Sequence, residues 1–79
     1  MAVITRFGME IAINTHLAGN RLHNLLIQVV PQLKVDEEGN IRPEQVANIR
    51  KTLRAAMPHA PDDATKIKCQ KLLEFLEQY

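Results

Sequence analysis

The sequence predicts an all-α domain, folded as a small bundle of three helices. Apolar residues recur at spacings of three and four along most of the chain, which is the period of a helix with one buried face. Prolines close the periodic stretches, and proline cannot continue a helix because it lacks an N–H group. No repeat or low-complexity segment divides the 79 residues, so we expect residues 1–79 to form a single helical domain.

The first predicted helix covers the longest periodic stretch, residues 5–30, and Pro31 ends it. One apolar stripe follows the helical period through this stretch and is expected to face the core. It consists of Val3, Phe7, Ile11, Asn14, Ala18, Leu22, Leu25 and Val29. As a single helix the stretch would be about 39 Å long at 1.5 Å per residue, so we expect the remaining helices to cover it.

Two alternatives are open for this long first helix. Gly8 and Gly19 each cost about 1 kcal/mol relative to alanine inside a helix, so a break near Gly19 is one alternative. Met9, Ile11 and Ile13 alternate with smaller or polar neighbours, as residues of a half-buried strand do. A short strand over residues 9–13, followed by a helix capped by Asn14 or Thr15, is therefore the other.

The connector after the first helix, residues 32–42, is rich in turn-forming residues and is expected to be a loop or a short hairpin. Its run DEEGNI invites comparison with a calcium-binding loop. With Gly39 aligned to the glycine of such a loop, Lys34 and Gln45 occupy the positions that need a carboxylate and a bidentate glutamate. We therefore expect a solvated turn here.

The second helix is expected over residues 43–57, with Pro43 at its first position and Pro58 after its end. Its apolar stripe consists of Val46, Ile49, Leu53, Ala56 and Met57. The third helix follows a linker stiffened by two prolines, with Asp62 as its N-cap, and runs to about residue 78. Its apolar face consists of Thr65, Cys69, Leu72, Leu73, Leu76 and Tyr79.

The residue types argue against catalysis. The chain has no serine, and Cys69 lies within an apolar helix face, where a thiol is inert rather than activated. His16, Asn20 and His23 share one face, but the two histidines span two turns and no acid or cysteine joins them, whereas zinc needs three or four ligands. There is no glycine-rich phosphate loop. We therefore expect no enzyme, no metal and no cofactor.

Charge and cysteine content limit the partners and the location. Ten Lys and Arg residues against nine Asp and Glu residues leave a net charge of +1, too small for long-range attraction to nucleic acid or anionic lipid. No stretch approaches 18 uninterrupted apolar residues, so no segment should span a membrane. One cysteine cannot form an internal disulfide, and the first residues do not resemble a secretory signal. We expect a cytoplasmic protein.

Apolar residues outside the predicted core stripes suggest an interface, because exposed apolar patches tend to mark interaction sites. These residues are Met9, Ala12, Ile27 and Val30 on the first helix and Ile67 and Phe75 on the third. We expect a homodimer assembled through the first four, or a surface for a foreign protein partner. The predicted function is that of a small regulatory or adaptor protein that acts by protein–protein interaction.

The alternative function is that of a small dimeric DNA-binding regulator. Four basic residues border the stripe of the second helix or stand near its start: Arg42, Arg50, Lys51 and Arg54. A dimer would present this patch twice, as proteins that read two DNA half-sites do. The net charge near zero argues against this alternative.

Overall fold

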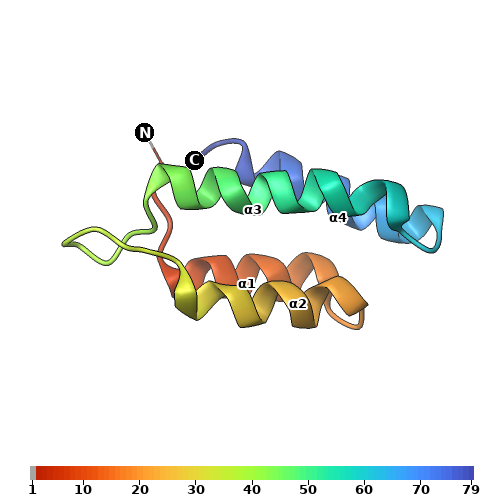
Figure 1. Ribbon diagram of the computed structural model, residues 1–79, viewed down its shortest axis with the longest axis horizontal. Coiled ribbons are helices and arrows are strands. Elements are labelled where there is room, and N and C mark those ends of the chain that lie inside the picture. The colour runs from red at the N-terminus through yellow and green to blue at the C-terminus, as the bar shows by residue number, and fades with distance from the viewer. Residues whose placement is uncertain (1) are drawn as a thin grey trace.

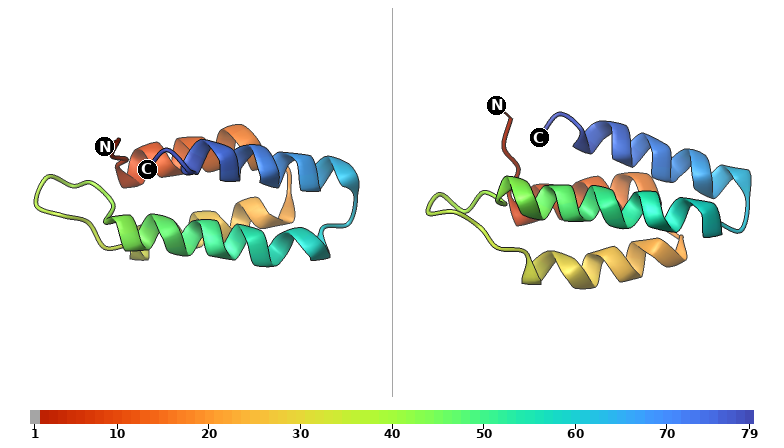
Figure 2. Two further views of the ribbon diagram at one scale, coloured as in Figure 1. Left: turned by 90° about the horizontal axis from the view of Figure 1, so that it is seen from above. Right: turned by 45° about the horizontal axis from the view of Figure 1, so that its top comes forward.

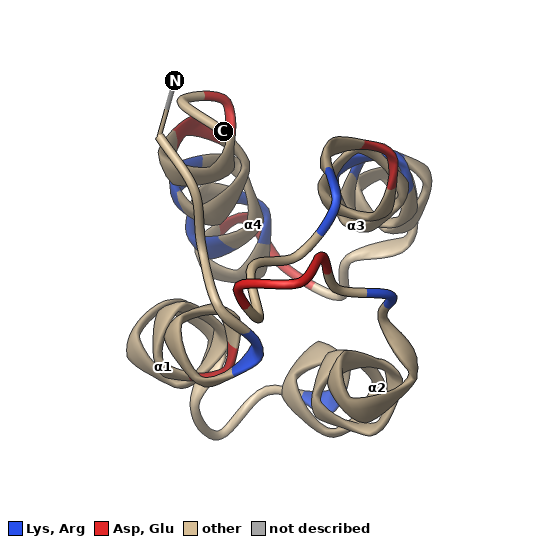
Figure 3. Ribbon diagram, turned by 90° about the vertical axis from the view of Figure 1, so that its left-hand side faces the viewer, with Lys and Arg blue, Asp and Glu red and all other residues tan. Residues whose placement is uncertain are grey.

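The computed structural model describes residues 2–79, and these form four α-helices. The helices are α1 (Arg6–Leu17), α2 (Arg21–Val29), α3 (Pro43–Ala56) and α4 (Asp63–Leu76). Consecutive helices run in opposite directions (Figures 1 and 2). Seen end-on, they occupy the four corners of a square (Figure 3). The all-α class is confirmed, but the architecture is an up-and-down four-helix bundle rather than a three-helix one, measuring 40 × 21 × 18 Å.

The predicted long first helix is broken, and the break lies at Gly19. This residue has φ 81°, a left-handed conformation that glycine adopts without steric cost and that commonly ends helices. The next residue, Asn20, starts α2, because its side-chain oxygen accepts a hydrogen bond from the Leu22 amide at 3.0 Å. The alternative of a break near Gly19 is therefore confirmed. The alternative of a strand over residues 9–13 is wrong, because Thr5 caps α1 and these residues are helical.

The face of α1 that packs in the core is opposite to the predicted one. Met9, Ala12, Ile13 and Leu17 are buried, whereas Phe7 and Ile11 of the predicted core stripe are exposed. The physical reason is that α1 is apolar on two opposite faces, so the helical period alone does not decide which face packs inward. The predicted stripe also fails on α2, where Leu25 is exposed and Leu26 is buried.

The connector closes one end of the core as a tight turn. The Asp36 carboxylate accepts hydrogen bonds from the amides of Glu38 and Asn40 at 2.9 and 3.0 Å, which is the geometry expected of a local turn. Ile41 is buried and donates its amide to the Ile4 carbonyl at 2.7 Å, which ties the connector to the chain before α1. The expected solvated turn is confirmed.

The two C-terminal helices follow the sequence prediction closely. Pro43 lies in the first turn of α3, and a short 3-10 turn, Met57–His59, follows the helix at Pro58. Asp62 caps α4 by accepting a hydrogen bond from the Thr65 amide at 2.7 Å. The predicted stripes of both helices are buried or half-buried. In the core they contribute Val46, Ile49, Leu53, Thr65, Cys69, Leu72, Leu73 and Leu76.

Candidate interaction surfaces

Three of the four residues predicted to form a dimer interface lie in the core of a single chain. Met9, Ala12 and Val30 keep 0%, 5% and 3% of their surface exposed. Side chains so deeply buried offer nothing to a second chain, so the predicted interface is corrected at these positions. Ile27 is half-buried and packs against the same core. Met9 and Ala12 were predicted to lie outside the core because the core face of α1 was predicted on the opposite side of the helix.

The two interface candidates on the last helix differ from each other. Phe75 is half-buried between α1 and α4, where its ring centroid lies 5.8 Å from that of His16 and 5.7 Å from that of Tyr79. Aromatic pairs at this separation stabilise packing. Phe75 therefore joins two helices of one chain. Ile67 is 55% exposed on the outer side of α4 and is a single apolar residue there, which needs no functional explanation.

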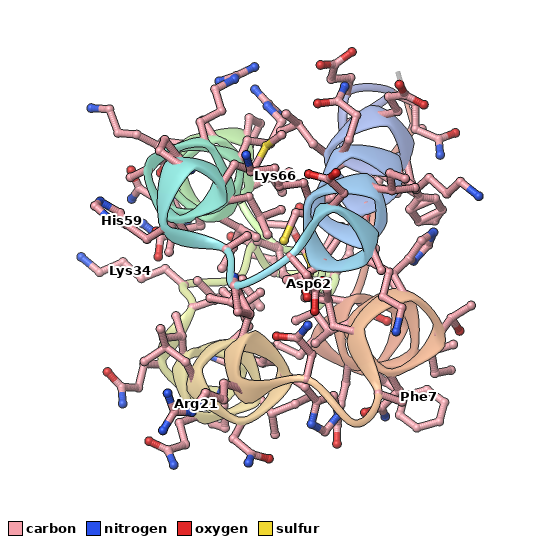
Figure 4. All side chains as sticks on the ribbon, turned by 90° about the vertical axis from the view of Figure 1, so that its right-hand side faces the viewer. Phe7, Arg21, Lys34, His59, Asp62 and Lys66 are labelled. Carbon is pink, nitrogen blue, oxygen red and sulfur yellow. The ribbon has the colours of Figure 1, made fainter. Side chains whose placement is uncertain are left out.

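The most apolar exposed feature is the outer side of α1. Phe7 and Ile11 are 70% and 48% exposed, and their spacing of four residues puts them on one face of the helix. Val3, 62% exposed, precedes the helix. We call Phe7 and Ile11 the α1 outer stripe. Figure 4 shows Phe7 pointing away from the bundle. Both residues belong to the stripe that the helical period predicts, but that stripe was expected to face the core and it faces outward.

A further exposed apolar residue, Leu25, lies on α2 and is 52% exposed. His23, two residues earlier, is hydrogen-bonded to Asn14 of α1, so that side of α2 faces α1. Residues two apart on a helix project roughly 200° apart. Leu25 therefore points away from α1.

A cleft of about 600 Å³ opens at the end of the bundle where both helix hairpins turn. Its lining residues are Gly19, Asn20, Arg21, Leu22, Ala56, His59, Ala60, Pro61, Asp62 and Thr65. Its polar groups are tied together across the two hairpins. Asn20 donates its side-chain N–H to the Thr65 hydroxyl at 3.1 Å, and the Thr65 amide and hydroxyl in turn lower the pKa of Asp62 by hydrogen bonding.

The four basic residues of the alternative DNA-binding patch do not form one free surface. Arg50 donates a hydrogen bond to the Leu76 carbonyl at 3.4 Å, where a cation complements the C-terminal end of α4. Arg54 lies 4.0 Å from the Glu77 carboxylate, and Arg42 is hydrogen-bonded to the Val35 carbonyl at 3.5 Å. Only Lys51 of the four makes no such bond within the described part of the chain. The carbonyls leave Arg50 and Arg42 charged, but three of the four side chains are engaged within the chain and only Arg54 of them faces an acid. This arrangement does not present the four cations together for phosphate contacts.

The other residues considered for chemistry have local structural roles. Cys69 is fully buried, and burial raises the pKa of its thiol, which disfavours the reactive thiolate. His16 bonds the Ala12 carbonyl at 2.8 Å, and Asn20 is a helix cap. Over residues 2–79, no group of three or more metal-ligating side chains comes together. Nor does any helix of this part have the length and apolar character needed to cross a bilayer.

Comparison of the chain with protein-family models, with curated proteins and with solved structures finds no match. A function for this chain is therefore inferred from the bundle and its exposed apolar residues.

Proposed function

We propose that this protein is a small protein-interaction module, a regulator or adaptor without chemistry of its own, which docks through the α1 outer stripe. The observation that carries the proposal is the exposure of Phe7 and Ile11 on one face of a helix whose opposite face already fills the core. The fold is complete without these two side chains. Amphipathic helices that present spaced apolar anchors are a common means of protein recognition.

The size of the stripe favours a foreign partner bound transiently over a stable homodimer. α1 has 12 residues and is therefore about 18 Å long. A stable interface buries about 800 Å² on each partner, which is nearly a sixth of the 5157 Å² surface of this chain. Two copies paired along α1 would cover little more than the stripe itself. A partner with its own apolar pocket would gain most from Phe7, because aromatic anchors carry much of the binding energy of interfaces.

The test is site-specific photo-crosslinking in the cells that produce the protein. A photoreactive amino acid replaces Ile11, and the matched control places it at Ile67, which is similarly exposed but lies on α4. We expect a discrete adduct with another protein from position 11 and none from position 67. A second change, Phe7→Glu, should reduce the yield of the adduct at least tenfold, because a charge would replace the aromatic anchor.

Two results would overturn this proposal. One is the same set of adducts from positions 11 and 67, which would show that the stripe is not selective. The other is an adduct of twice the chain mass at position 11, which would show that a second copy covers the stripe. Light scattering over a wide dilution range provides an independent check: we expect the mass of a monomer, 9.0 kDa, at every concentration. The cytoplasmic location stays a prediction.

A further inference from the structure

Three side chains form a continuous chain of hydrogen bonds at the end cleft, where both helix hairpins turn (Figure 1). Asn20 of the first hairpin donates its side-chain N–H to the Thr65 hydroxyl at 3.1 Å. The Thr65 hydroxyl is hydrogen-bonded to the Asp62 carboxylate, which also accepts the Thr65 amide at 2.7 Å. We call Asn20, Thr65 and Asp62 the cap chain, because its two ends are the N-caps of α2 and α4.

The cap chain joins the two hairpins in a way that no other part of the bundle does. Within residues 2–79, the bond from Asn20 to Thr65 is the one hydrogen bond that runs directly between the first hairpin, residues 6–29, and the second, residues 43–76. The core between the hairpins is apolar, and apolar burial is not directional. The cap chain therefore supplies the directional contact that holds the two hairpin turns in place.

The middle of the cap chain is buried, which makes its bonds depend on one another. Thr65 is 6% exposed and is the one polar residue among the buried side chains of the described part. Its hydroxyl has a single proton, so it donates to Asp62 and accepts from Asn20. A buried hydroxyl that loses a partner costs free energy, and bonds arranged in a chain polarise one another. Loss of one bond should therefore weaken the other.

We propose that the cap chain is a latch that holds the two hairpins together at the end cleft and that acid releases, while the rest of the bundle stays folded. All three of its residues line the cleft, so release loosens the cleft walls. The latch also couples the two caps: α2 begins where the Leu22 amide donates to Asn20 at 3.0 Å, and that bond shares its fate with the cap of α4.

The sensitivity to acid follows from the charged end of the cap chain. Hydrogen bonds from the Thr65 amide and hydroxyl, helped by the charge of Lys68, lower the pKa of Asp62 below 3.8 against the opposing effect of burial. The contribution of the latch is therefore present above that pH and is lost as the pH falls through the lowered pKa. The other titratable or charged side chains around Asp62 are Arg21 and His59 in the cleft and Asp63 beside it.

The first test measures amide hydrogen exchange by NMR on the full chain, expressed as protection factors. The Leu22 and Thr65 amides report on the first turns of α2 and α4. The Ile41 amide, bonded to the Ile4 carbonyl near the opposite end, is the internal reference. Asn20→Ser keeps a capping oxygen but is too short to reach the other hairpin. We expect this variant to lower the protection of the Thr65 amide about three- to tenfold, the effect of one hydrogen bond.

The reciprocal change and two matched controls complete this test. Asp62→Ala should lower the protection of the Leu22 amide, on the other hairpin, by a similar factor. Thr65→Val should lower both, because it keeps the shape and removes the hydroxyl, and Thr65→Ser should restore them. Thr5→Ala removes the cap of α1, which bonds only its own helix, and should leave the Leu22 and Thr65 amides unchanged. If Thr65→Val unfolds the chain, Asn20→Ser still decides the question.

The second test lowers the pH from about 6 to about 2, where a carboxyl with a lowered pKa becomes neutral. Relative to Ile41, the protection of the Leu22 and Thr65 amides should fall about three- to tenfold. The circular dichroism of the helices should persist. Asp62→Asn keeps an acceptor for the Thr65 amide but does not titrate, so its protection ratio should stay constant over the same range.

Three outcomes would overturn the inference. Effects of Asn20→Ser and Asp62→Ala that stay within their own hairpins would show that the two caps are independent. An equal loss of protection at Ile41 in acid would show global unfolding rather than release of one end. An acid response that survives in Asp62→Asn would assign the titration to another group. None of these results bears on crosslinking from Ile11, so the latch and the proposed docking are tested separately.

Discussion

Replacing Met9 and Phe7 by alanine, one at a time, tests which face of α1 supports the fold. Met9 is fully buried, and truncating such a side chain costs about 2 to 5 kcal/mol through lost burial and the cavity left behind. Phe7 keeps 70% of its surface in water. Full burial of such a side chain contributes about 1.5 to 3 kcal/mol, so the buried fraction of Phe7 contributes less than about 1 kcal/mol.

Alanine also forms helix more readily than phenylalanine, by several tenths of a kcal/mol, which offsets part of the loss at position 7. We therefore expect Phe7→Ala to change the free energy of unfolding by about 0.5 kcal/mol or less. The whole domain should be stable by about 4 to 12 kcal/mol, at 0.05 to 0.15 kcal/mol per residue. Met9→Ala then removes a large share of that stability and lowers the Tm by about 10 °C or more.

The assay is urea unfolding followed by circular dichroism at the helical band, with thermal melts of the same samples. Met9→Leu is the control, because a swap that nearly conserves volume usually costs less than about 1.5 kcal/mol. If Phe7→Ala proved more destabilising than Met9→Ala, α1 would be rotated by half a turn. Phe7 would then belong to the core, and the proposed docking stripe would not exist.

Three further predictions concern the turn, the cap and the thiol. Gly19→Ala should destabilise the fold by about 1 to 2 kcal/mol, because φ 81° is a left-handed conformation that a Cβ disfavours, and urea unfolding measures this. Hydrogen bonds from the Thr65 amide, and next from its hydroxyl, lower the pKa of Asp62 below 3.8, so its charge stabilises the fold above that pH and this contribution is lost as the pH falls through the lowered pKa. Asp62→Asn, neutral at every pH, should flatten this acid limb of the unfolding curve; an unchanged limb would contradict the role of Asp62. Cys69, fully buried, should resist a thiol reagent in the native state and react at once in denaturing urea, and fast native labelling would contradict its burial.

The second half of the fold was predictable because local signals agree with one another. Pro43, Pro58 and Asp62 mark the ends of α3 and α4, and each helix has one main apolar stripe. A helix with one apolar face can pack in only one orientation. The stripe of α4, from Thr65 to Leu76, is therefore buried as its spacing predicts.

The first half was harder to predict because α1 is apolar on two opposite faces. Its rotation is decided by long-range contacts that spacing does not encode. Arg6 donates a hydrogen bond from Nε to the Leu33 carbonyl at 2.9 Å, and His16 packs against Phe75 of α4. Both residues lie on the same side of α1 as Met9, so they hold this side inward.

The second apolar face of α1 now needs an explanation that the fold does not provide. With Met9, Ile13 and Leu17 in the core, polar residues at positions 7 and 11 would serve the bundle equally well, and alanine would favour the helix more. Exposed Phe7 and Ile11 also carry a risk, because contiguous apolar surface promotes association. A feature that contributes little to stability and adds this risk is what we expect of a binding surface. Folding thus accounts for one face of α1, and the proposed docking would account for the other.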